Sequence, residues 1–289
     1  MSKSNYQATL FILLTTALWG GTFAFIKDAV ATFSVGNFLF WRFGLASILL
    51  GLVFFKHIHF SNFKLMKEGM ILGVLFGLGA ITQSIGLRFT SASTASFITV
   101  LEVIWVPIFI GLYQRRWPGW TVSLAVLLAV GGVLLITWQE GVHINPGDIW
   151  VVICSLFFAC YTLAASKISH SGEPLTITFF QLLTIAVMSL ALSRGQISVP
   201  QTANVWLSIF YCAIFASVLA FYLQVRFQRY VTATKAAIIF SAEPIFATLT
   251  AVLYLNETIS SRFVFGALLI FSGILLSEFK LKEKILPQE

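Results

Sequence analysis

The sequence has few charged residues for its length. Only 10% of its 289 residues are Asp, Glu, Lys or Arg, whereas 58% are hydrophobic. Soluble globular domains carry about 25% charged residues, because their surface has to be polar. The composition therefore excludes a soluble domain and an intrinsically disordered chain. Nucleic acid is not expected as a partner despite the net charge of +7, because the basic residues lie between apolar stretches and form no cluster.

Cysteine is equally scarce. The three cysteines, Cys154, Cys160 and Cys212, all lie within apolar runs. An odd number of cysteines in such surroundings indicates small buried residues, so neither a disulfide framework nor a metal site is expected. We also expect no cofactor.

Residues for catalysis and for ATP hydrolysis are missing as well. All four histidines fall in predicted loops, and only two acidic residues fall deep within apolar segments. An intramembrane enzyme would need a constellation of His, Cys, Ser or paired acids. The chain also lacks a Gly-rich loop that ends in Gly-Lys-Ser or Gly-Lys-Thr, so ATP is not expected to drive its function. We therefore expect a protein that is not an enzyme.

Long apolar runs take the place of these features. A helix that crosses the hydrocarbon core of a bilayer needs about 20 mainly apolar residues, and its backbone polar groups must be bonded within the helix. Ten such windows occur between the polar connections: 7–27, 34–55, 70–87, 92–113, 120–138, 148–167, 175–192, 205–225, 235–255 and 262–278. The sequence therefore predicts an all-α integral membrane protein with ten transmembrane helices.

The basic residues predict the orientation of these spans. In short loops Lys and Arg are more frequent on the cytoplasmic side of the membrane. With the N-terminus in the cytoplasm, 13 of the 18 Lys and Arg residues lie inside, four lie outside, and Arg42 lies within the second span. This distribution predicts that both termini are cytoplasmic. We expect the protein to be integral to the plasma membrane, which in a bacterium is the inner membrane.

The two halves of the chain resemble each other. A shift of 141 residues gives six identities within residues 88–107. The match of Glu102 with Glu243 is the most informative, because acidic residues are rare in spans. The further matched pairs are Gln83 with Gln224 at a shift of 141, and Thr22 with Thr162 and Lys27 with Lys167 at a shift of 140.

We predict two repeats, residues 1–141 and residues 142–289, with five spans in each. Because five is an odd number, the second repeat enters the membrane from the opposite side. The result is an inverted repeat with a pseudo-twofold axis in the membrane plane. Two similar halves of opposite orientation can exchange conformations, so this architecture favours transport by alternating access.

Five short motifs follow one another from about residue 10 to residue 278. They are Trp-Gly-Gly-Thr-Phe at 19–23, Trp-Arg-Phe at 41–43, Thr-Ser-Ala-Ser at 90–93, Ser-Ala-Glu-Pro at 241–244 and Leu-Asn-Glu at 255–257. In the order and spacing of these motifs the chain resembles the EamA-type transporters of the drug/metabolite transporter superfamily. The resemblance implies ten helices around a cavity lined by spans 1, 3, 4, 6, 8 and 9. It also implies the movement, often outward, of amino acids, other small metabolites or drugs.

One departure from the family pattern concerns the acid that follows the last pair of spans in each half. This acid is present as Glu257, but the first half has Arg115 and Arg116 at the corresponding place. We expect this site to be structural and assign it no role in transport.

Two carboxylates stand out because they fall near the middle of predicted spans. Glu102 lies in the span 92–113, and Glu243 lies in the span 235–255. A charged residue at a helix centre costs about 2.5–3.5 kcal/mol on insertion scales, so such residues usually serve a function. We expect both to bind a cationic group of the substrate and Glu102 to carry protons. The alternative is that each is protonated or bonded to a neighbouring helix.

Arg42 is the only basic residue predicted deep within a span. It is expected either to form an ion pair with Glu102 or to bind a substrate carboxylate. The ion pair is favoured, because an arginine at this place in the second span resembles a family feature.

Aromatic residues make up 15% of the chain, so most of them must face lipid or neighbouring helices. Trp19, Trp41, Trp105 and Tyr161 differ because they lie away from the span ends, where an indole N–H or a phenol needs a partner. We predict that they line the substrate site, where an amine over an aromatic face gains about 2 kcal/mol when desolvated. Ordinary packing against a hydroxyl of the next helix is the alternative.

Four further residues complete the predicted site. Gln83 and Gln224 are matched between the halves, and they are expected to bind polar groups of the substrate or to hold helices together. Pro107 and Pro244 remove backbone hydrogen bonds from the two glutamate-bearing spans, and we predict that they act as hinges.

These features together predict a secondary transporter that exports or exchanges small amine-bearing metabolites, such as amino acids or polyamines, by alternating access. One alternative is a neutral amino-acid or amphipathic drug exporter whose glutamates are structural. Another, of a different class, is a membrane receptor or scaffold. The expected partners are a small-molecule substrate, protons as a candidate coupling ion, and the lipid bilayer. The oligomeric state stays open.

Overall fold

The protein consists of helices throughout its described length. The computed structural model describes residues 3–115, 120–137, 145–231, 236 and 239–279, and no strand occurs among them. Seven helical segments in this part of the chain are long and apolar enough to cross a membrane, and three shorter helices are also apolar. The predicted all-α membrane fold is confirmed.

The helices follow the order of the predicted spans. The first half contains α1 (Lys3–Thr32), α2 (Val35–Phe54), η1 (Phe55–His57), α3 (Phe63–Gly86), α4 (Ala92–Thr99), α5 (Glu102–Tyr113) and α6 (Trp120–Thr137). The second half contains α7 (Pro146–Ile168), η2 (Ser169–Ser171), α8 (Pro174–Leu192), α9 (Ala203–Ala213), η3 (Ile214–Leu219), α10 (Ala220–Phe227), η4 (Gln228–Tyr230), α12 (Glu243–Leu255) and α13 (Ser261–Phe279). The predicted repeat boundary at residues 141 and 142, together with Arg116 and Lys235, lies outside the described residues.

Side-chain caps define where several helices begin. Ser34, Asn62, Ser91 and Asn145 each precede a helix and accept a hydrogen bond from a backbone N–H in its first turn. A side-chain oxygen at this position satisfies an N–H that no helical carbonyl can reach. Pro146 follows the cap of α7, where its missing N–H leaves no bond unmade. The capping residues in the short connections therefore fix where these four helices begin.

Large apolar side chains cover the outside of the bundle. Leu52 in α2, Leu127 in α6 and Phe265 in α13 are 76%, 68% and 63% exposed. In water such a surface would favour association, whereas in a bilayer lipid tails solvate it. The exposed apolar faces therefore agree with helices that are packed within a membrane.

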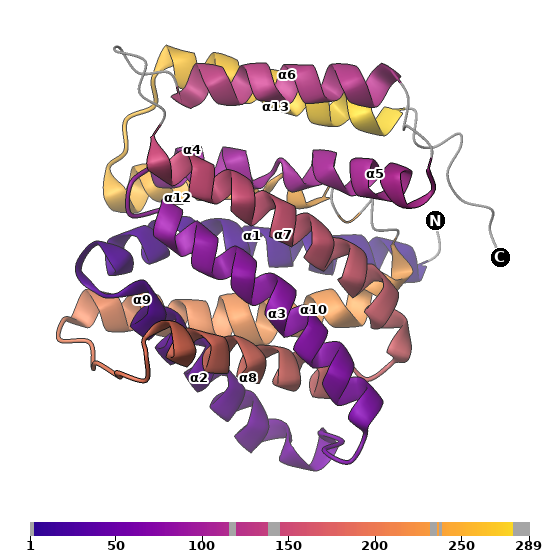
Figure 1. Ribbon diagram of the computed structural model, residues 1–289, viewed down its shortest axis with the longest axis vertical. Coiled ribbons are helices and arrows are strands. Elements are labelled where there is room, and N and C mark those ends of the chain that lie inside the picture. Colours follow the sequence, from indigo (N-terminus) through magenta and orange to yellow (C-terminus); the bar gives the residue numbers. More distant parts are fainter. Residues whose placement is uncertain (1–2, 116–119, 138–144, 232–235, 237–238, 280–289) are drawn as a thin grey trace.

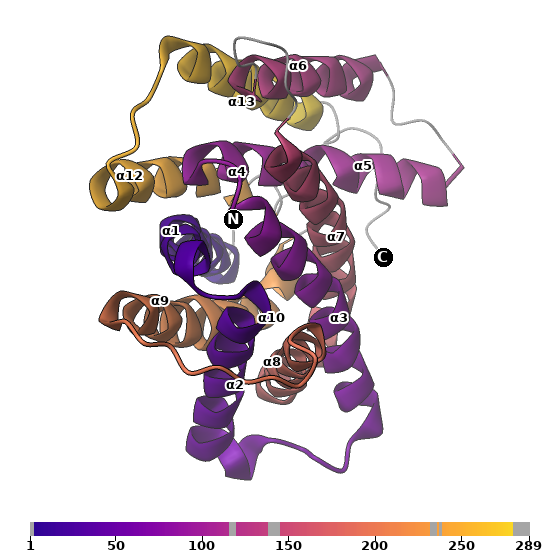
Figure 2. The same cartoon turned by 60° about the vertical axis from the view of Figure 1, so that its left-hand side comes forward.

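The two halves of the chain are interleaved. α1 of the first half packs along α12 of the second, and α7 of the second half packs against α4 and α5 of the first (Figures 1 and 2). In addition, α2 packs on α8, and α6 packs on α13. Exchanging the two halves turns the contact of α1 with α12 into the contact of α7 with α4 and α5. The same exchange turns the α2–α8 contact and the α6–α13 contact into themselves. This is the pattern expected of a pseudo-twofold repeat.

Successive spans run in opposite directions through the bundle. In Figure 1, α1 begins at Lys3 and α13 ends at Phe279 on the same side, at the right of the view. We call this the terminal side. The first helix of the second half, α7, begins on the opposite side. The two halves therefore enter the bundle from opposite sides, as five spans in each half require.

Two of the predicted spans are not continuous helices. A turn at Val100 and Leu101 divides the span predicted at 92–113 into α4 and α5, and α12 begins only at Glu243 within the span predicted at 235–255. The span predicted at 205–225 is continuous, but η3 within it is π-helical. Both interruptions fall in the two glutamate-bearing spans, where the sequence predicted that proline would remove backbone hydrogen bonds, but apolar composition does not report the position of a local turn.

Glycines set the distance between crossing helices. A Cβ added to Gly132 in α6 would lie 2.5 Å from the carbonyl oxygen of Gly266 in α13, and one added to Gly266 would lie 2.7 Å from the carbonyl oxygen of Gly132. Gly86 in α3 and Gly147 in α7 face each other in the same way. In a membrane, where van der Waals packing holds helices together, such residues let two backbones approach closely.

We expect Gly132→Ala to lower the free energy of unfolding by about 1–3 kcal/mol, the usual cost of an overpacked site. Gly131→Ala is the matched control, because an added Cβ there would meet no atom within 4 Å. Gly131→Ala should leave stability unchanged or raise it slightly, since alanine favours helix more than glycine does. Unfolding of the purified protein in detergent measures both changes, and equal effects would contradict the role given to the α6–α13 crossing.

Candidate substrate site

The two predicted glutamates each begin a helix, α5 or α12, immediately after a tight turn. In the first half, Leu101 N donates to the carbonyl oxygen of Ile98 at 3.1 Å. In the second half, Ala242 N donates to the carbonyl oxygen of Ile239, also at 3.1 Å. These bonds span three residues, as in a 3₁₀ turn, and their partners are related by the shift of 141 residues that aligns the halves. The interruption is therefore a property of the repeat.

Proline does not account for both turns. Pro244 lies in the first turn of α12, whereas Pro107 lies inside α5, beyond the turn. The residues matched to them at a shift of 141 are Val103 and Thr248, so the two prolines are out of register although the turns are in register. The interruption of the first half thus precedes Pro107. The hinge function of both prolines stays a prediction.

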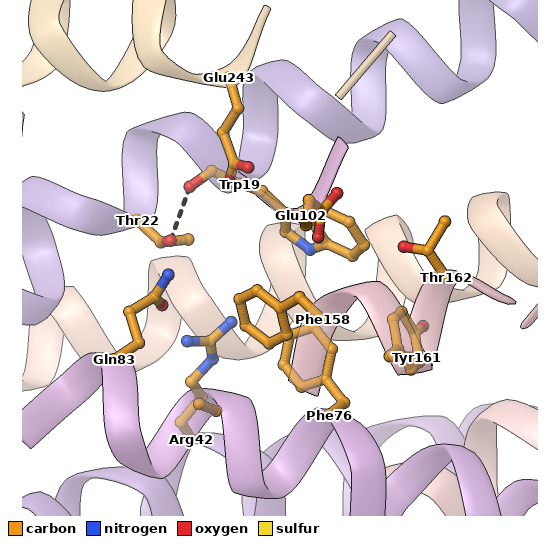
Figure 3. A pocket seen from close by; sticks show the side chains of 11 residues that line it. Trp19, Thr22, Arg42, Phe76, Gln83, Glu102, Phe158, Tyr161, Thr162 and Glu243 are labelled. Atoms are coloured by element: carbon orange, nitrogen blue, oxygen red, sulfur yellow. Dashed lines mark hydrogen bonds between the residues drawn. The ribbon is translucent and has the colours of Figure 1, made fainter. Parts of the chain in front are cut away.

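Both glutamates face one small cavity inside the bundle (Figure 3). Its lining residues are Trp19, Thr22, Arg42, Phe76, Ala80, Gln83, Glu102, Phe158, Tyr161, Thr162 and Glu243. The cavity has a volume of about 30 Å³, which is enough for no more than a few water molecules. The site is therefore closed in this conformation, and a metabolite can enter only when the surrounding side chains move.

The carboxylates of Glu102 and Glu243 have no fixed partner. Neither forms a hydrogen bond or an ion pair with another described residue, although Glu102 is only 6% exposed. The two side chains face the same cavity (Figure 3). Two like charges in a small buried cavity need a proton or a cation to balance them. The arrangement can therefore hold a cation between the two halves of the chain.

Arg42 enters the same cavity from α2. Its Nε donates to Ser217 Oγ at 3.1 Å, and its guanidinium carbon lies 4.7 Å from the centre of the Phe43 ring. No carboxylate of the described residues lies within 4.0 Å of a guanidinium nitrogen of Arg42. The predicted ion pair between Arg42 and Glu102 is therefore not formed in this conformation. The remaining donors of Arg42 point into the cavity (Figure 3).

Trp19 and Tyr161 are the two predicted aromatic residues that line the cavity. The indole N–H of Trp19 donates to the carbonyl oxygen of Ala216 at 2.9 Å, so its ring is held in one orientation. Phe76 packs against both residues, with ring centroids 5.9 Å from Trp19 and 5.1 Å from Tyr161. It also stacks on Phe158 at 4.9 Å. The cavity therefore has an aromatic wall built from α1, α3 and α7.

Trp41 and Trp105 do not line the cavity. The indole N–H of Trp41 donates to the carbonyl oxygen of Ser198 at 2.8 Å, and that of Trp105 donates to Ser155 Oγ at 3.0 Å. Ser198 lies in the connection between α8 and α9 and Ser155 lies in α7, so each indole N–H has its partner outside the cavity lining. The prediction that they line the site is not supported by their positions.

The two matched glutamines occupy different environments. Gln83 lines the cavity, and its Nε2 donates to Thr99 Oγ1 at 3.4 Å. Gln224 lies behind the cavity wall, where its Oε1 accepts a hydrogen bond from the Tyr161 hydroxyl at 2.5 Å. This hydrogen bond holds the Tyr161 hydroxyl in place, so Gln224 affects the site indirectly, through Tyr161.

The cavity is lined by spans 1, 2, 3, 4, 6 and 9. The family resemblance implied span 8 and did not include span 2. Span 2 contributes Arg42. Span 8 lies behind the lining residues and contacts two of them, since the carbonyl oxygen of Ala216 accepts from Trp19 and the amide oxygen of Gln224 accepts from Tyr161. In this closed conformation the lining therefore differs from the implied set of spans at these two places.

Sequence reasoning missed five lining residues. Thr22 and Thr162 had a signal, because they are matched at a shift of 140, and both reach the cavity. Phe76, Ala80 and Phe158 had none. The chain has 29 phenylalanines, and no sequence pattern distinguishes those that line the cavity from those that pack elsewhere.

Glu257 caps a helix of the other half. Its carboxylate accepts hydrogen bonds from Ala92 N at 2.7 Å, from Ser93 N at 3.2 Å and from Ser93 Oγ at 2.7 Å. An anion at this position also interacts favourably with the dipole of α4. Lys27 Nζ donates to the carbonyl oxygen of Thr90 at 2.7 Å in the preceding connection. Glu257 thus fastens the second half to the start of α4.

Comparison with known proteins places the chain in a family. The sequence model of the EamA-like transporter family matches residues 7–138 and, a second time, residues 145–279. The chain belongs to the EamA-like transporter family. Each half alone carries the EamA-like pattern, in agreement with the pairs of matched residues. Membership of a transporter family also agrees with the expectation that the protein is not an enzyme.

Individual relatives of this EamA-like chain are named uncharacterized transporters. One from Archaeoglobus fulgidus is 32% identical over 93% of this chain and 85% of its own length. YyaM of Bacillus subtilis is 26% identical, with 89% and 88% covered, and YicL, an inner membrane transporter of Salmonella typhimurium, is 24% identical, with 94% and 95% covered. A protein of known crystal structure is similar in fold, with a TM-score of 0.66, 17% identity, and 96% and 99% of the two chains covered.

We expect Glu257→Ala to lower the free energy of unfolding by about 1–3 kcal/mol, because it leaves two backbone N–H groups of α4 without their acceptor. Glu257→Gln keeps one carbonyl oxygen and should lose less. Glu173→Ala is the control, since that exposed carboxylate forms only a pair with His59 at 3.6 Å, and such pairs contribute about 0–1 kcal/mol. Equal losses for Glu257→Ala and Glu173→Ala in detergent unfolding experiments would show that the cap is unimportant.

Proposed function

We propose that this EamA-family protein is a secondary transporter that exports or exchanges small amine-bearing metabolites, such as amino acids or polyamines, by alternating access. Glu102 carries the coupled proton in this proposal. The protein lies in the plasma membrane, the inner membrane of a bacterium, with both termini in the cytoplasm.

The convergence of two carboxylates on one cavity supports an amine-bearing substrate. Glu102 comes from the first half and Glu243 from the second, and neither has a partner among the described residues. A substrate ammonium group would supply the positive charge that the pair lacks. It would also lie against the faces of Trp19 and Phe76, where a desolvated cation gains about 2 kcal/mol.

The position of the glutamates supports alternating access. Each carboxylate begins a helix after a turn, and each helix belongs to a different half of the inverted repeat. A cation bound to both would contact both halves at once. Its binding energy can therefore differ between conformations, which is the condition for a ligand to shift the balance between them.

Arg42 favours an amino acid over a diamine. Its guanidinium faces the same cavity and has no carboxylate partner among the described residues. A guanidinium repels a second ammonium group but binds a carboxylate with two hydrogen bonds.

A neutral amino-acid or amphipathic drug exporter with structural glutamates is the alternative within transport. A receptor or scaffold is the alternative of a different class, and such a protein would carry no solute across the membrane.

A ligand screen tests the substrate class. The purified protein is heated in the presence of putrescine, L-lysine, L-threonine, L-phenylalanine or a nucleoside. A selective amine is expected to raise the unfolding temperature, because binding at 100 times its Kd stabilises the fold by about 2.7 kcal/mol. An amino acid should stabilise more than putrescine. Stabilisation by nucleosides alone would contradict an amine-binding site.

We expect Glu102→Gln to lower uptake of the stabilising amine into proteoliposomes by roughly tenfold or more, equal to about 1.4 kcal/mol, and to remove its pH dependence. The amide keeps the size of the side chain but can neither carry a proton nor balance an ammonium charge. Glu173→Gln, at an exposed site, is the control. Proton coupling at Glu102 is wrong if Glu102→Gln keeps both the rate and the pH dependence.

A further inference from the structure

Two short helices connect the cavity with one side of the bundle. α4 leads through a turn to Glu102, and α12 begins with Glu243. The two helices pack against each other (Figures 1 and 2), and the start of α4 is bonded to the residues that follow α12. Their inner ends therefore hold the two carboxylates of the cavity. Their outer ends lie together on the side opposite the terminal side, which we call the distal side.

Glu257 joins the two outer ends. Asn256 ends α12 with a left-handed backbone, at a φ of 56°, and Glu257 N donates to the carbonyl oxygen of Ala251 at 3.2 Å. Glu257 is thereby fixed to α12. Its carboxylate accepts the N–H groups of Ala92 and Ser93 and the hydroxyl group of Ser93, which are all in the first turn of α4. One side chain thus ties a helix of the second half to a helix of the first.

Neighbouring contacts hold the connection between α3 and α4, residues 87–91, on the distal side. Lys27 Nζ, from α1, donates to the carbonyl oxygen of Thr90 at 2.7 Å. Asn145 Nδ2, just before α7, donates to the carbonyl oxygen of Phe89, also at 2.7 Å. The connection is therefore fastened to elements of both halves, and it can move away from the bundle only if these bonds break.

α4 links this connection to the cavity. It has eight residues and is therefore roughly 12 Å long. At its inner end Thr99 Oγ1 accepts from Gln83 Nε2, which lines the cavity, and the turn that follows is closed by the bond from Leu101 N to the carbonyl oxygen of Ile98. A displacement of the outer end of α4 therefore reaches Glu102 through a helix and a hydrogen-bonded turn.

We propose that Glu257 and Ser93 form a latch that keeps the cavity closed on the distal side. Release of this latch lets the outer ends of α4 and α12 separate, and the cavity opens between them. Both latch residues are positioning residues, because they act on Glu102 and Glu243 through the two helices. That the opening serves transport rests on the proposed function, whereas the latch can be tested without a substrate.

The two halves of the chain differ at the latch. The residue matched to Glu257 at a shift of 141 is Arg116, and an arginine side chain has no atom that accepts a hydrogen bond. The repeat thus provides this carboxylate once. We therefore expect the latch to favour the conformation that is closed on the distal side over its counterpart.

Cysteine labelling tests the latch directly. In a background in which the three native cysteines are replaced by alanine, Thr22→Cys places a thiol in the cavity lining (Figure 3). Thr22 is 4% exposed, so this thiol should react slowly with a small membrane-impermeant reagent applied to the distal side. Adding Ser93→Ala or Glu257→Gln should raise the rate by roughly tenfold, because the balance between closed and open conformations depends exponentially on the energy of the lost bonds.

Ser91→Ala is the matched control for this experiment. The Ser91 hydroxyl caps the same helix, but it accepts from Thr94 N at 2.9 Å within the same segment and joins no other helix. A general weakening of α4 would therefore raise labelling equally in Ser91→Ala and Ser93→Ala, and that result would overturn the proposal. Unchanged labelling in Ser93→Ala and Glu257→Gln, or an increase only from the terminal side, would overturn it too.

A reversible cross-link tests whether transport requires the latch to open. Ser93→Cys and Glu257→Cys are joined by a short bifunctional thiol reagent that forms reducible disulfides. The joined protein should still be stabilised by the amine found in the ligand screen, but its flux into proteoliposomes should fall by roughly tenfold and return after reduction. Equal flux before and after reduction would show that the latch is no gate. If no amine stabilises the unmodified protein, the proposed substrate class fails, and the labelling experiment still decides whether the latch exists.

Discussion

Hydrocarbon offers no hydrogen bonds, and this constraint governs where the chain can depart from a helix inside the membrane. The two turns that precede Glu102 and Glu243 lie within the bundle, where other helices surround them. The first turn separates α4 from α5, and each of the two turns is followed by a helix whose first residue is a glutamate. The backbone irregularity and the two acids thus occupy the same protected place. The cavity, its aromatic wall and the guanidinium of Arg42 all surround this place.

Much of the fold could be predicted from composition and from internal repetition. Apolar windows predicted the all-α membrane fold, because a bilayer imposes a minimum length on every crossing helix, and seven helical segments of the described chain are long and apolar enough to cross. The match between Glu102 and Glu243 predicted that both would serve one site, and the two side chains do line one cavity. Thr22 and Thr162, matched in the same way, also meet there. Repetition was informative because symmetry-related residues of an inverted repeat approach the same axis.

The remaining parts of the site depend on packing, which a single sequence does not report. Trp41 and Trp105 look like Trp19 in sequence, yet Trp41 donates to Ser198 in the connection between α8 and α9, and Trp105 donates to Ser155 in α7. Gln83 and Gln224 are matched, but one faces the cavity and the other supports Tyr161 from behind. Side-chain environment is set by neighbours from distant parts of the chain. The repeat therefore predicts which positions correspond and leaves open which of them reach the ligand.

The π-helical segment η3 has a consequence for the register of the two halves. Early matched pairs such as Thr22 and Thr162 are 140 residues apart, whereas later pairs such as Gln83 and Gln224 are 141 apart. The second half thus has one additional residue before Gln224, and η3 lies in that interval. One extra residue would rotate the rest of an α-helix by about 100° and turn Gln224 away from Tyr161. A wider turn takes up an insertion of this kind with little rotation. An additional residue taken up at η3 would leave the phase of the following turns unchanged, in agreement with the hydrogen bond between Gln224 and Tyr161.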